Sequence, residues 1–131
     1  MKIEKKYLDL LLKVTQNSKC NLKEARIRDK FIKNIVDEYK TKEEDRVKIC
    51  EALCVKGKDK KPIMKNNNYQ FTPENIPKFQ KEFEALLSEK VTLTLLPIDA
   101  KLILKLIDNT KYEPEIGEVE IIDEQIIPLI K

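Results

Sequence analysis

A purely acidic stretch near the end of the sequence is the densest group of chemically active side chains. Its carboxylates belong to Glu113, Glu115, Glu118, Glu120, Asp123 and Glu124, and no basic residue interrupts them. Such a stretch can imitate nucleic acid toward a basic protein, supply oxygen ligands to Ca²⁺ or Mg²⁺, or form the polar face of a guarded edge strand. The alternation from Glu118 to Ile122 favours the edge strand and leaves the other two interpretations open.

Four lysines form a second candidate site, a basic loop in the middle of the chain. They are Lys56, Lys58, Lys60 and Lys61. The ammonium groups are suited to phosphate or to an acidic partner. Solvated loop lysines are common, so an ordinary surface loop is the competing interpretation. We therefore place the predicted partner-binding residues in the acidic stretch and in this loop.

Two cysteines, Cys50 and Cys54, lie one helical turn apart, which is a spacing suited to two ligands of one metal ion. Cys20 would be a third ligand, and the sequence has no histidine to complete the set. Both cysteines also continue an apolar stripe with Val47 and Leu53, and free cysteine behaves as a small buried hydrophobe. We predict packing in the core, with no metal and no cofactor. Three cysteines without a C-x-x-C pair also indicate a reducing cytosol.

Several classes of catalytic site are excluded by composition. The 131 residues include no His and only two Gly. Triads that contain histidine and glycine-rich phosphate loops therefore cannot form, and we predict that the protein is not an enzyme. Four Tyr and four Phe are too few and too scattered along the chain for a base-stacking platform.

The charges are distributed unevenly along the chain. Lys and Arg number 26 against 23 Asp and Glu, a net charge of +3. Residues 1–65 carry 19 basic and 11 acidic side chains, whereas residues 66–131 carry 7 and 12. The asymmetry favours packing of the two halves against each other, and steering of a charged partner is the alternative. The small net charge argues against nucleic acid as a direct ligand. The charged N-terminal segment predicts neither a signal peptide nor a membrane span.

The elements that must position these residues begin with two helices. Apolar spacing predicts a helix over residues 4–17 and a long one over 22–54, which contains no Gly or Pro. Asn21 and Glu24 have the spacing of a capping box. Residues 40–46 offer no apolar side chain, so we expect these turns to be exposed and supported by ion pairs.

The second part of the chain mixes short strands and helices. A hairpin is predicted around the asparagines at 66–68, and Thr72 and Pro73 begin a helix that extends to about residue 89. A strand at 91–95, a short helix at 100–107 capped by Asp99, and an acidic strand at 118–122 follow.

These elements predict an α+β fold in a single domain, residues 1–131. Residues 1–55 form an antiparallel helical hairpin with a long second helix, and residues 56–72 form the basic loop and a short β-hairpin. Residues 73–131 add a third helix, a strand, a short helix and the acidic β tail, with a small mixed or edge sheet near the C-terminus.

Four segments carry a resemblance to a known family. They are residues 23–31, 43–51, 69–71 and 79–91. In them the chain resembles small accessory proteins encoded by phages and mobile elements of low-GC Gram-positive bacteria. The resemblance covers residues 5–107, implies two antiparallel helices followed by a turn, a strand and a third helix, and carries over no functional residue.

If the source is such an element, binding to a host or phage protein in the bacterial cytosol is the expected function. The most concrete form is an inhibitor of a host defence nuclease of the CRISPR type, with the acidic stretch occluding a nucleic-acid-binding surface. An assembly factor in phage morphogenesis and a nucleic-acid-binding protein that uses the basic N-terminal half are the alternatives. A homodimer also stays open as a partner, and no membrane is expected.

Overall fold

The computed structural model describes all residues from 1 to 131, which divide into two compact units. Unit 1 combines Met1–Tyr39 with Lys90–Lys131, and unit 2 is the intervening segment Lys40–Glu89. The assignment of the whole chain to one domain stays a prediction.

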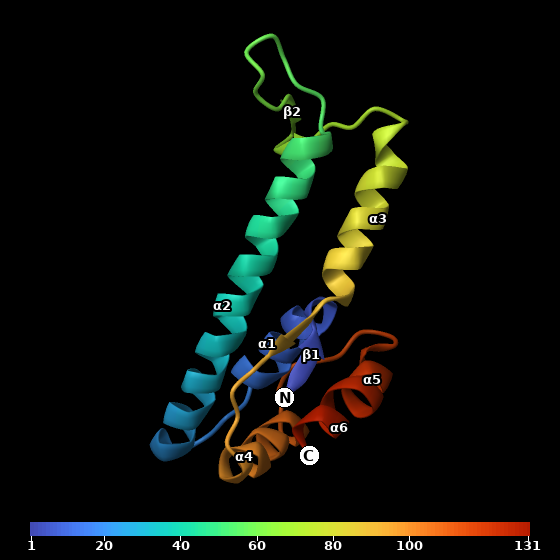
Figure 1. Ribbon diagram of the computed structural model, residues 1–131. Coiled ribbons are helices and arrows are strands. Elements are labelled where there is room, and N and C mark those ends of the chain that lie inside the picture. The colour runs from blue at the N-terminus through green and yellow to red at the C-terminus, as the bar shows by residue number, and fades with distance from the viewer. The chain divides into compact units, whose positions relative to one another are not determined.

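Unit 1 contains most of the secondary structure, and the α+β class with a long second helix is confirmed (Figure 1). Its elements are β1 (Lys2–Glu4), the 3₁₀ turn η1 (Lys5–Tyr7), α1 (Leu8–Gln16), the first half of α2 (Leu22–Leu53), β4 (Lys90–Thr92), α4 (Pro97–Asp108), α5 (Glu118–Ile121), the π-helical turn η2 (Ile122–Ile126) and α6 (Ile127–Ile130). None of these helices combines the length and the apolar composition that crossing a lipid bilayer requires.

Helix α2 is continuous over Leu22–Leu53, as the absence of Gly and Pro predicts. Its start is fixed by the predicted capping box: the Glu24 N–H donates to Asn21 Oδ1 at 2.9 Å, and the Asn21 N–H donates to Glu24 Oε1 at 3.2 Å. The polar turns after Tyr39 stay helical. The prediction that they are exposed is wrong for Lys42, which is 8% exposed and has its Nζ 3.6 Å from Glu43 Oε1. Arg46 Nε lies 3.0 Å from Glu43 Oε2, one of the predicted supporting pairs.

The sheet of unit 1 joins the N-terminus to a strand almost ninety residues later. β1 pairs with β4 in antiparallel register, with Ile3 opposite Val91. The Leu93 N–H extends the ladder to the Met1 carbonyl at 2.8 Å. The prediction of a strand near 91–95 is confirmed in type, although it ends at Thr92. The helix predicted from residue 4 begins as α-helix only at Leu8, because Glu4 ends β1 and residues 5–7 form the 3₁₀ turn η1.

The C-terminal tail departs from the prediction. Residues 118–122, predicted as an acidic strand, are helical, so the sheet near the C-terminus does not include them. Ile122, Ile126 and Ile130 recur every fourth residue and are all buried in the core of unit 1. Burial of this stripe, which has helical spacing, outweighs the shorter alternation of Glu and Ile.

Helix α4 also begins earlier than predicted. Its first residue is Pro97 and its N-cap is Leu96, so Asp99 lies in the first turn and not at the cap. Proline suits this first position because its fixed φ is helical and because a backbone N–H at this position would have no partner within the helix.

Unit 2 consists of the second half of α2, a hairpin and α3 (Asn75–Ser88). β2 (Met64–Lys65) and β3 (Asn68–Tyr69) are antiparallel. The two turn residues, Asn66 and Asn67, have φ of 52° and 63°, which is the type I′ geometry that the prediction of an asparagine turn requires.

Helix α3 begins close to its predicted start, but the Thr72 side chain does not cap it as predicted. The N–H groups of Asn75 and Ile76 donate to the Thr72 carbonyl, and the Thr72 hydroxyl forms no cap. Asn75 Nδ2 donates to the Leu53 carbonyl at 3.0 Å and so ties the start of α3 to the end of α2 within unit 2.

Candidate interaction surfaces

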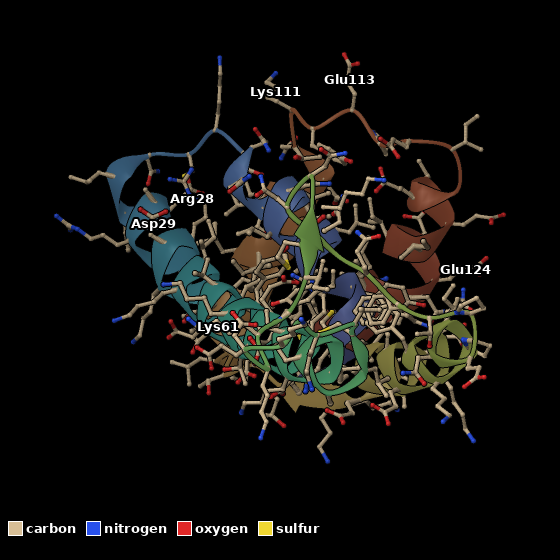
Figure 2. All side chains as sticks on the ribbon, turned by 90° about the horizontal axis from the view of Figure 1, so that it is seen from above. Arg28, Asp29, Lys61, Lys111, Glu113 and Glu124 are labelled. Atoms are coloured by element: carbon tan, nitrogen blue, oxygen red, sulfur yellow. The ribbon has the colours of Figure 1, made fainter.

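The acidic stretch of the sequence is divided in space. Glu113, Glu115 and Glu120 are exposed on the segment that runs into α5, which we call the acidic loop, residues 113–120. Figure 2 shows Glu113 on this loop and Glu124 well apart from it, on the helical end of the chain. The predicted partner-binding residues Asp123 and Glu124 are exposed but belong to η2, so the six carboxylates do not form one patch.

Glu118 differs from its neighbours because its carboxylate is used within the protein. Its Oε1 accepts the Tyr112 hydroxyl and the Glu115 N–H, both at 2.7 Å. The backbone bond, followed by the tyrosine bond, lowers the pKa of Glu118 below its ordinary value. The same contact raises the pKa of Tyr112. Glu118 therefore shapes the acidic loop, and its carboxylate is not free for a partner.

The remaining carboxylates of the acidic loop have no cation beside them. No Lys or Arg nitrogen lies within the 4.0 Å of an ion pair from Glu113, Glu115 or Glu120. Ile116, which follows Glu115 in the sequence, has a relative exposure of 106%. No three of the Cys, Asp and Glu residues gather as a metal-binding group, so the interpretation as a Ca²⁺ or Mg²⁺ site has no support. An apolar side chain among free carboxylates is the arrangement that the structure presents instead.

The expected attraction between the two halves of the sequence is small within unit 1. One ion pair joins them, from Lys105 Nζ to Glu24 Oε2 at 3.3 Å. In this pair the acidic half supplies the cation and the basic half supplies the anion, which is the reverse of the expected attraction. The positive charge of Lys13 also helps to lower the pKa of Glu118. The acidic loop is therefore not neutralised by direct ion pairs with the basic N-terminal segment.

The predicted basic loop forms a tight turn in unit 2. The Lys60 N–H donates to the Gly57 carbonyl and the Gly57 N–H donates to the Lys61 carbonyl, both at 3.0 Å. Lys60 adopts a φ of 63°, and Asp59 Oδ1 accepts the Lys61 N–H at 3.0 Å. Lys56 is bridged to Pro62 at the base of the turn.

All four lysines of this loop, and Lys65 beyond it, are exposed. None has a carboxylate within the distance of an ion pair. Asp59 is the single acidic side chain of the loop, and its hydrogen bond to the Lys61 N–H leaves its negative charge in place. Four positive charges and one negative charge therefore give the loop an excess of positive charge that faces solvent. Figure 2 shows Lys61, one of these side chains, on this segment.

The predicted burial of the two helical cysteines is confirmed. Cys50 is 2% exposed and Cys54 is 9% exposed. Burial raises the pKa of the Cys50 thiol, and the nearby Arg46 opposes that rise. The protonated thiol is a poor metal ligand and a poor nucleophile, which agrees with a packing role.

Three of the four Phe form an aromatic cluster in unit 2. The ring of Phe79 stacks on Phe71, with centroids 4.8 Å apart, and on Phe83, with centroids 5.6 Å apart. The interpretation of the aromatic residues as scattered is therefore wrong for three of the four Phe. The spacing of Phe79 and Phe83, one helical turn apart, was the available signal.

Two of the stacked rings, Phe71 and Phe79, line a hollow of about 240 Å³. The lining residues are Arg46, Cys50, Asn67, Asn68, Tyr69, Phe71 and Phe79. The side-chain amides of Asn67 and Asn68 and the Tyr69 hydroxyl have no hydrogen-bond partner in the protein. Partial burial raises the pKa of Tyr69, which keeps its phenol neutral. The hollow thus combines aromatic surface with free donors and acceptors.

Arg46 is the one cation of this hollow. Its Nε donates to Glu43 Oε2 at 3.0 Å, and its Nη1 lies 3.8 Å from Cys50 Sγ. The bond to Glu43 raises the pKa of Arg46 and holds the guanidinium in one orientation. A planar, oriented cation beside aromatic rings is suited to flat ligands that carry acceptors.

Comparison of the chain with protein-family models, with curated proteins and with solved structures finds no match.

Proposed function

We propose that the protein is a non-enzymatic binding protein that uses the acidic loop to dock on a basic surface of a partner protein. The observation that carries the proposal is the loop itself: its eight residues hold three exposed carboxylates without an ion pair and the fully exposed Ile116. Val119, which is 52% exposed, adds a second apolar side chain to the loop, and neighbouring exposed apolar side chains rimmed by polar groups mark interaction sites. The complementary partner has an apolar pocket with a rim of Lys and Arg.

The loop is built to hold this shape before a partner arrives. Glu118 joins Tyr112 and the backbone of Glu115 through one carboxylate oxygen. Gly117, with a φ of 88°, provides the left-handed N-cap residue after which α5 begins at Glu118. A loop ordered in advance loses less conformational entropy on binding.

The kind of partner follows from the charge. Basic surfaces with apolar pockets occur where proteins bind nucleic acid, so a carboxylate loop would compete with the phosphates there. In its most concrete form the proposal is an accessory protein of a phage or mobile element, acting in the host cytosol. It would inhibit a defence nuclease of the CRISPR type by occupying the nucleic-acid channel.

The experiment measures cleavage by a purified RNA-guided nuclease of a low-GC Gram-positive host. We expect inhibition when the protein is added before the target DNA and none when the DNA is bound first. The Glu113→Gln, Glu115→Gln, Glu120→Gln triple variant should weaken inhibition about tenfold, since each exposed charge contributes about 0.5 kcal/mol. Ile116→Ser should weaken it as well.

The matched control is Asp123→Asn, Glu124→Gln, which removes charge from the same sequence stretch but outside the acidic loop. We expect no change in inhibition for this control. Glu118 is left intact in every variant because its loss would alter the loop. Equal inhibition by the wild type and the triple variant would contradict the proposal, as would a large homo-oligomer in light scattering, which favours an assembly role.

A further inference from the structure

We propose that unit 2 carries a binding site for single-stranded nucleic acid, formed by the basic loop together with the aromatic hollow. The lysines of the loop would contact phosphates, and one base would enter the hollow and continue the stack that ends at Phe71. This inference is independent of the proposed function, because it concerns other residues in a different unit.

The first observation is the excess of positive charge in the hairpin region. Five lysines at positions 56, 58, 60, 61 and 65 are exposed and have no ion-pair partner. Flexible ammonium groups suit a backbone whose path varies, and they contribute affinity without reading sequence. Such a group of charges by itself describes only an attraction for anions.

The second observation, the hollow, adds a preference for flat rings. Phe71 is the end of a three-ring stack and lines the hollow. A base that stacks on such a platform contributes about 1–3 kcal/mol regardless of its identity. The free amides of Asn67 and Asn68 can pair with the edge of the base, as occurs when unstacked bases are bound.

The backbone connects the two parts. The Ile63 N–H donates to the Val55 carbonyl at 2.9 Å, and the Val55 N–H donates to the Gln70 carbonyl at 2.7 Å. The chain therefore passes from the basic loop along residues 61–65 directly to the asparagine turn. Met64, which pairs with Tyr69, comes three residues after Lys61 in the sequence. An extended chain rises about 3.3 Å for each of these residues, so the distance between the loop and the hairpin is short. A short oligonucleotide spans this distance.

An anionic membrane is the competing partner for this region. Ile63 and Met64 are 45% and 47% exposed beside the lysines, and apolar residues with flanking lysines can enter a lipid headgroup layer. That partner would leave the hollow unused. The polar amides and the oriented Arg46 of the hollow are suited to a base, so the observations favour a nucleic acid.

The test is fluorescence anisotropy with a labelled oligothymidylate and oligouridylate of about twelve nucleotides. We expect binding at about 50 mM salt that weakens toward about 200 mM, with a slope of log affinity against log salt near −3 for four or five phosphates. Phe71→Leu and Asn67→Gly should each lower affinity about tenfold or less. Glycine at position 67 keeps the positive φ and removes only the amide.

A matched pair of variants separates the site from general charge. Lys56, Lys58, Lys60 and Lys61 are changed together to Gln in the first variant, and Lys19, Lys23, Lys30 and Lys33 in the second. Both variants lose four charges. We expect the first to reduce the size of the salt slope to about 1, because Lys65 and Arg46 remain, and the second to bind like the wild type, with unchanged circular dichroism in both.

Three results would overturn the inference. They are absence of binding by the wild type at low salt, equal loss of affinity in the two lysine variants, and unchanged affinity in both hollow variants. Binding to vesicles that contain phosphatidylserine without binding to the oligonucleotides would assign the region to a membrane. Chemical-shift changes at the Asn67 and Asn68 side-chain amides on oligonucleotide addition would support the site directly.

Discussion

The two units differ most in how much apolar surface they bury. Unit 1 holds a core of fourteen buried apolar side chains, whereas unit 2 holds three, Cys50, Cys54 and Leu86. The three stacked Phe side chains of unit 2 are only partly buried. Burial of apolar side chains therefore contributes more to the stability of unit 1 than to that of unit 2.

The difference also concerns where binding chemistry is placed. In unit 1 the acidic loop lies on the surface of a well-packed core, and its shape is set by one carboxylate, Glu118. In unit 2 the aromatic rings serve packing and line a hollow at the same time. A region with so few buried side chains cannot separate the residues that stabilise it from the residues that bind.

The largest effect is expected from a cavity in the core of unit 1. Ile103 on α4 is fully buried, so Ile103→Ala should lower the free energy of unfolding by about 2–5 kcal/mol. Urea denaturation followed by circular dichroism measures the loss. Ile98→Ala, at a position on the same helix that is 77% exposed, is the control and should change little. A loss below about 1 kcal/mol for Ile103→Ala would mean that the core of unit 1 is not close-packed.

The next effect concerns a buried hydroxyl that joins two parts of unit 1. Ser18 Oγ lies 2.7 Å from the Leu106 carbonyl and 3.0 Å from the Val14 carbonyl. Ser18→Ala should cost about 1–3 kcal/mol, because a buried acceptor loses its donor. Thermal unfolding checks this value, with Ser88→Ala at the exposed end of α3 as the comparison. Equal melting temperatures for the two variants would contradict the prediction that the Ser18 hydroxyl stabilises unit 1.

A smaller loss is expected in unit 2. Phe79→Leu keeps an apolar side chain but removes both ring contacts, each of which contributes about 0.5–1.5 kcal/mol. Hydrogen exchange should show loss of amide protection confined to Lys40–Glu89, with unit 1 unchanged. Loss of protection throughout both units would show that they unfold as one.

The smallest effect is the dependence of the acidic loop on pH. Because folding lowers the pKa of Glu118, its charge stabilises the folded state above its ordinary pKa of 4.5, and this contribution is lost as the pH falls through the lowered value. Glu118→Gln keeps an acceptor for Tyr112 but removes the charge. The difference in stability between the wild type and this variant should be present at neutral pH and vanish in acid. A difference that stays constant with pH would contradict the assignment.

The sequence was sufficient for the features that depend on local chemistry. The capping box at Asn21, the uninterrupted α2 and the asparagine turn each follow from properties of a few adjacent residues. The tail was mispredicted because two periodicities overlap there. The alternation from Glu118 to Ile122 predicts a strand, whereas Ile122, Ile126 and Ile130 follow a helical repeat that tertiary burial selects.

The candidate sites divide in the same way. The acidic and basic residues were identified because their charges are consecutive in the sequence, but the internal role of Glu118 depends on Tyr112 and on the fold of the loop. The aromatic hollow needed a hairpin, α2 and α3 to bring Arg46, Tyr69 and Phe79 together. No local pattern encodes contacts across such separations.

The insertion of unit 2 between the two segments of unit 1 affects the order in which the protein forms during synthesis. β1 lacks its partner β4 until residue 92 has been made, and Leu11 on α1 lacks α4 for longer still. At roughly 5–20 residues per second, the nascent N-terminal segment waits several seconds with its apolar face uncovered. Over that interval unit 2, whose contacts are closer together in sequence, is the first part of the chain able to complete its fold on the ribosome.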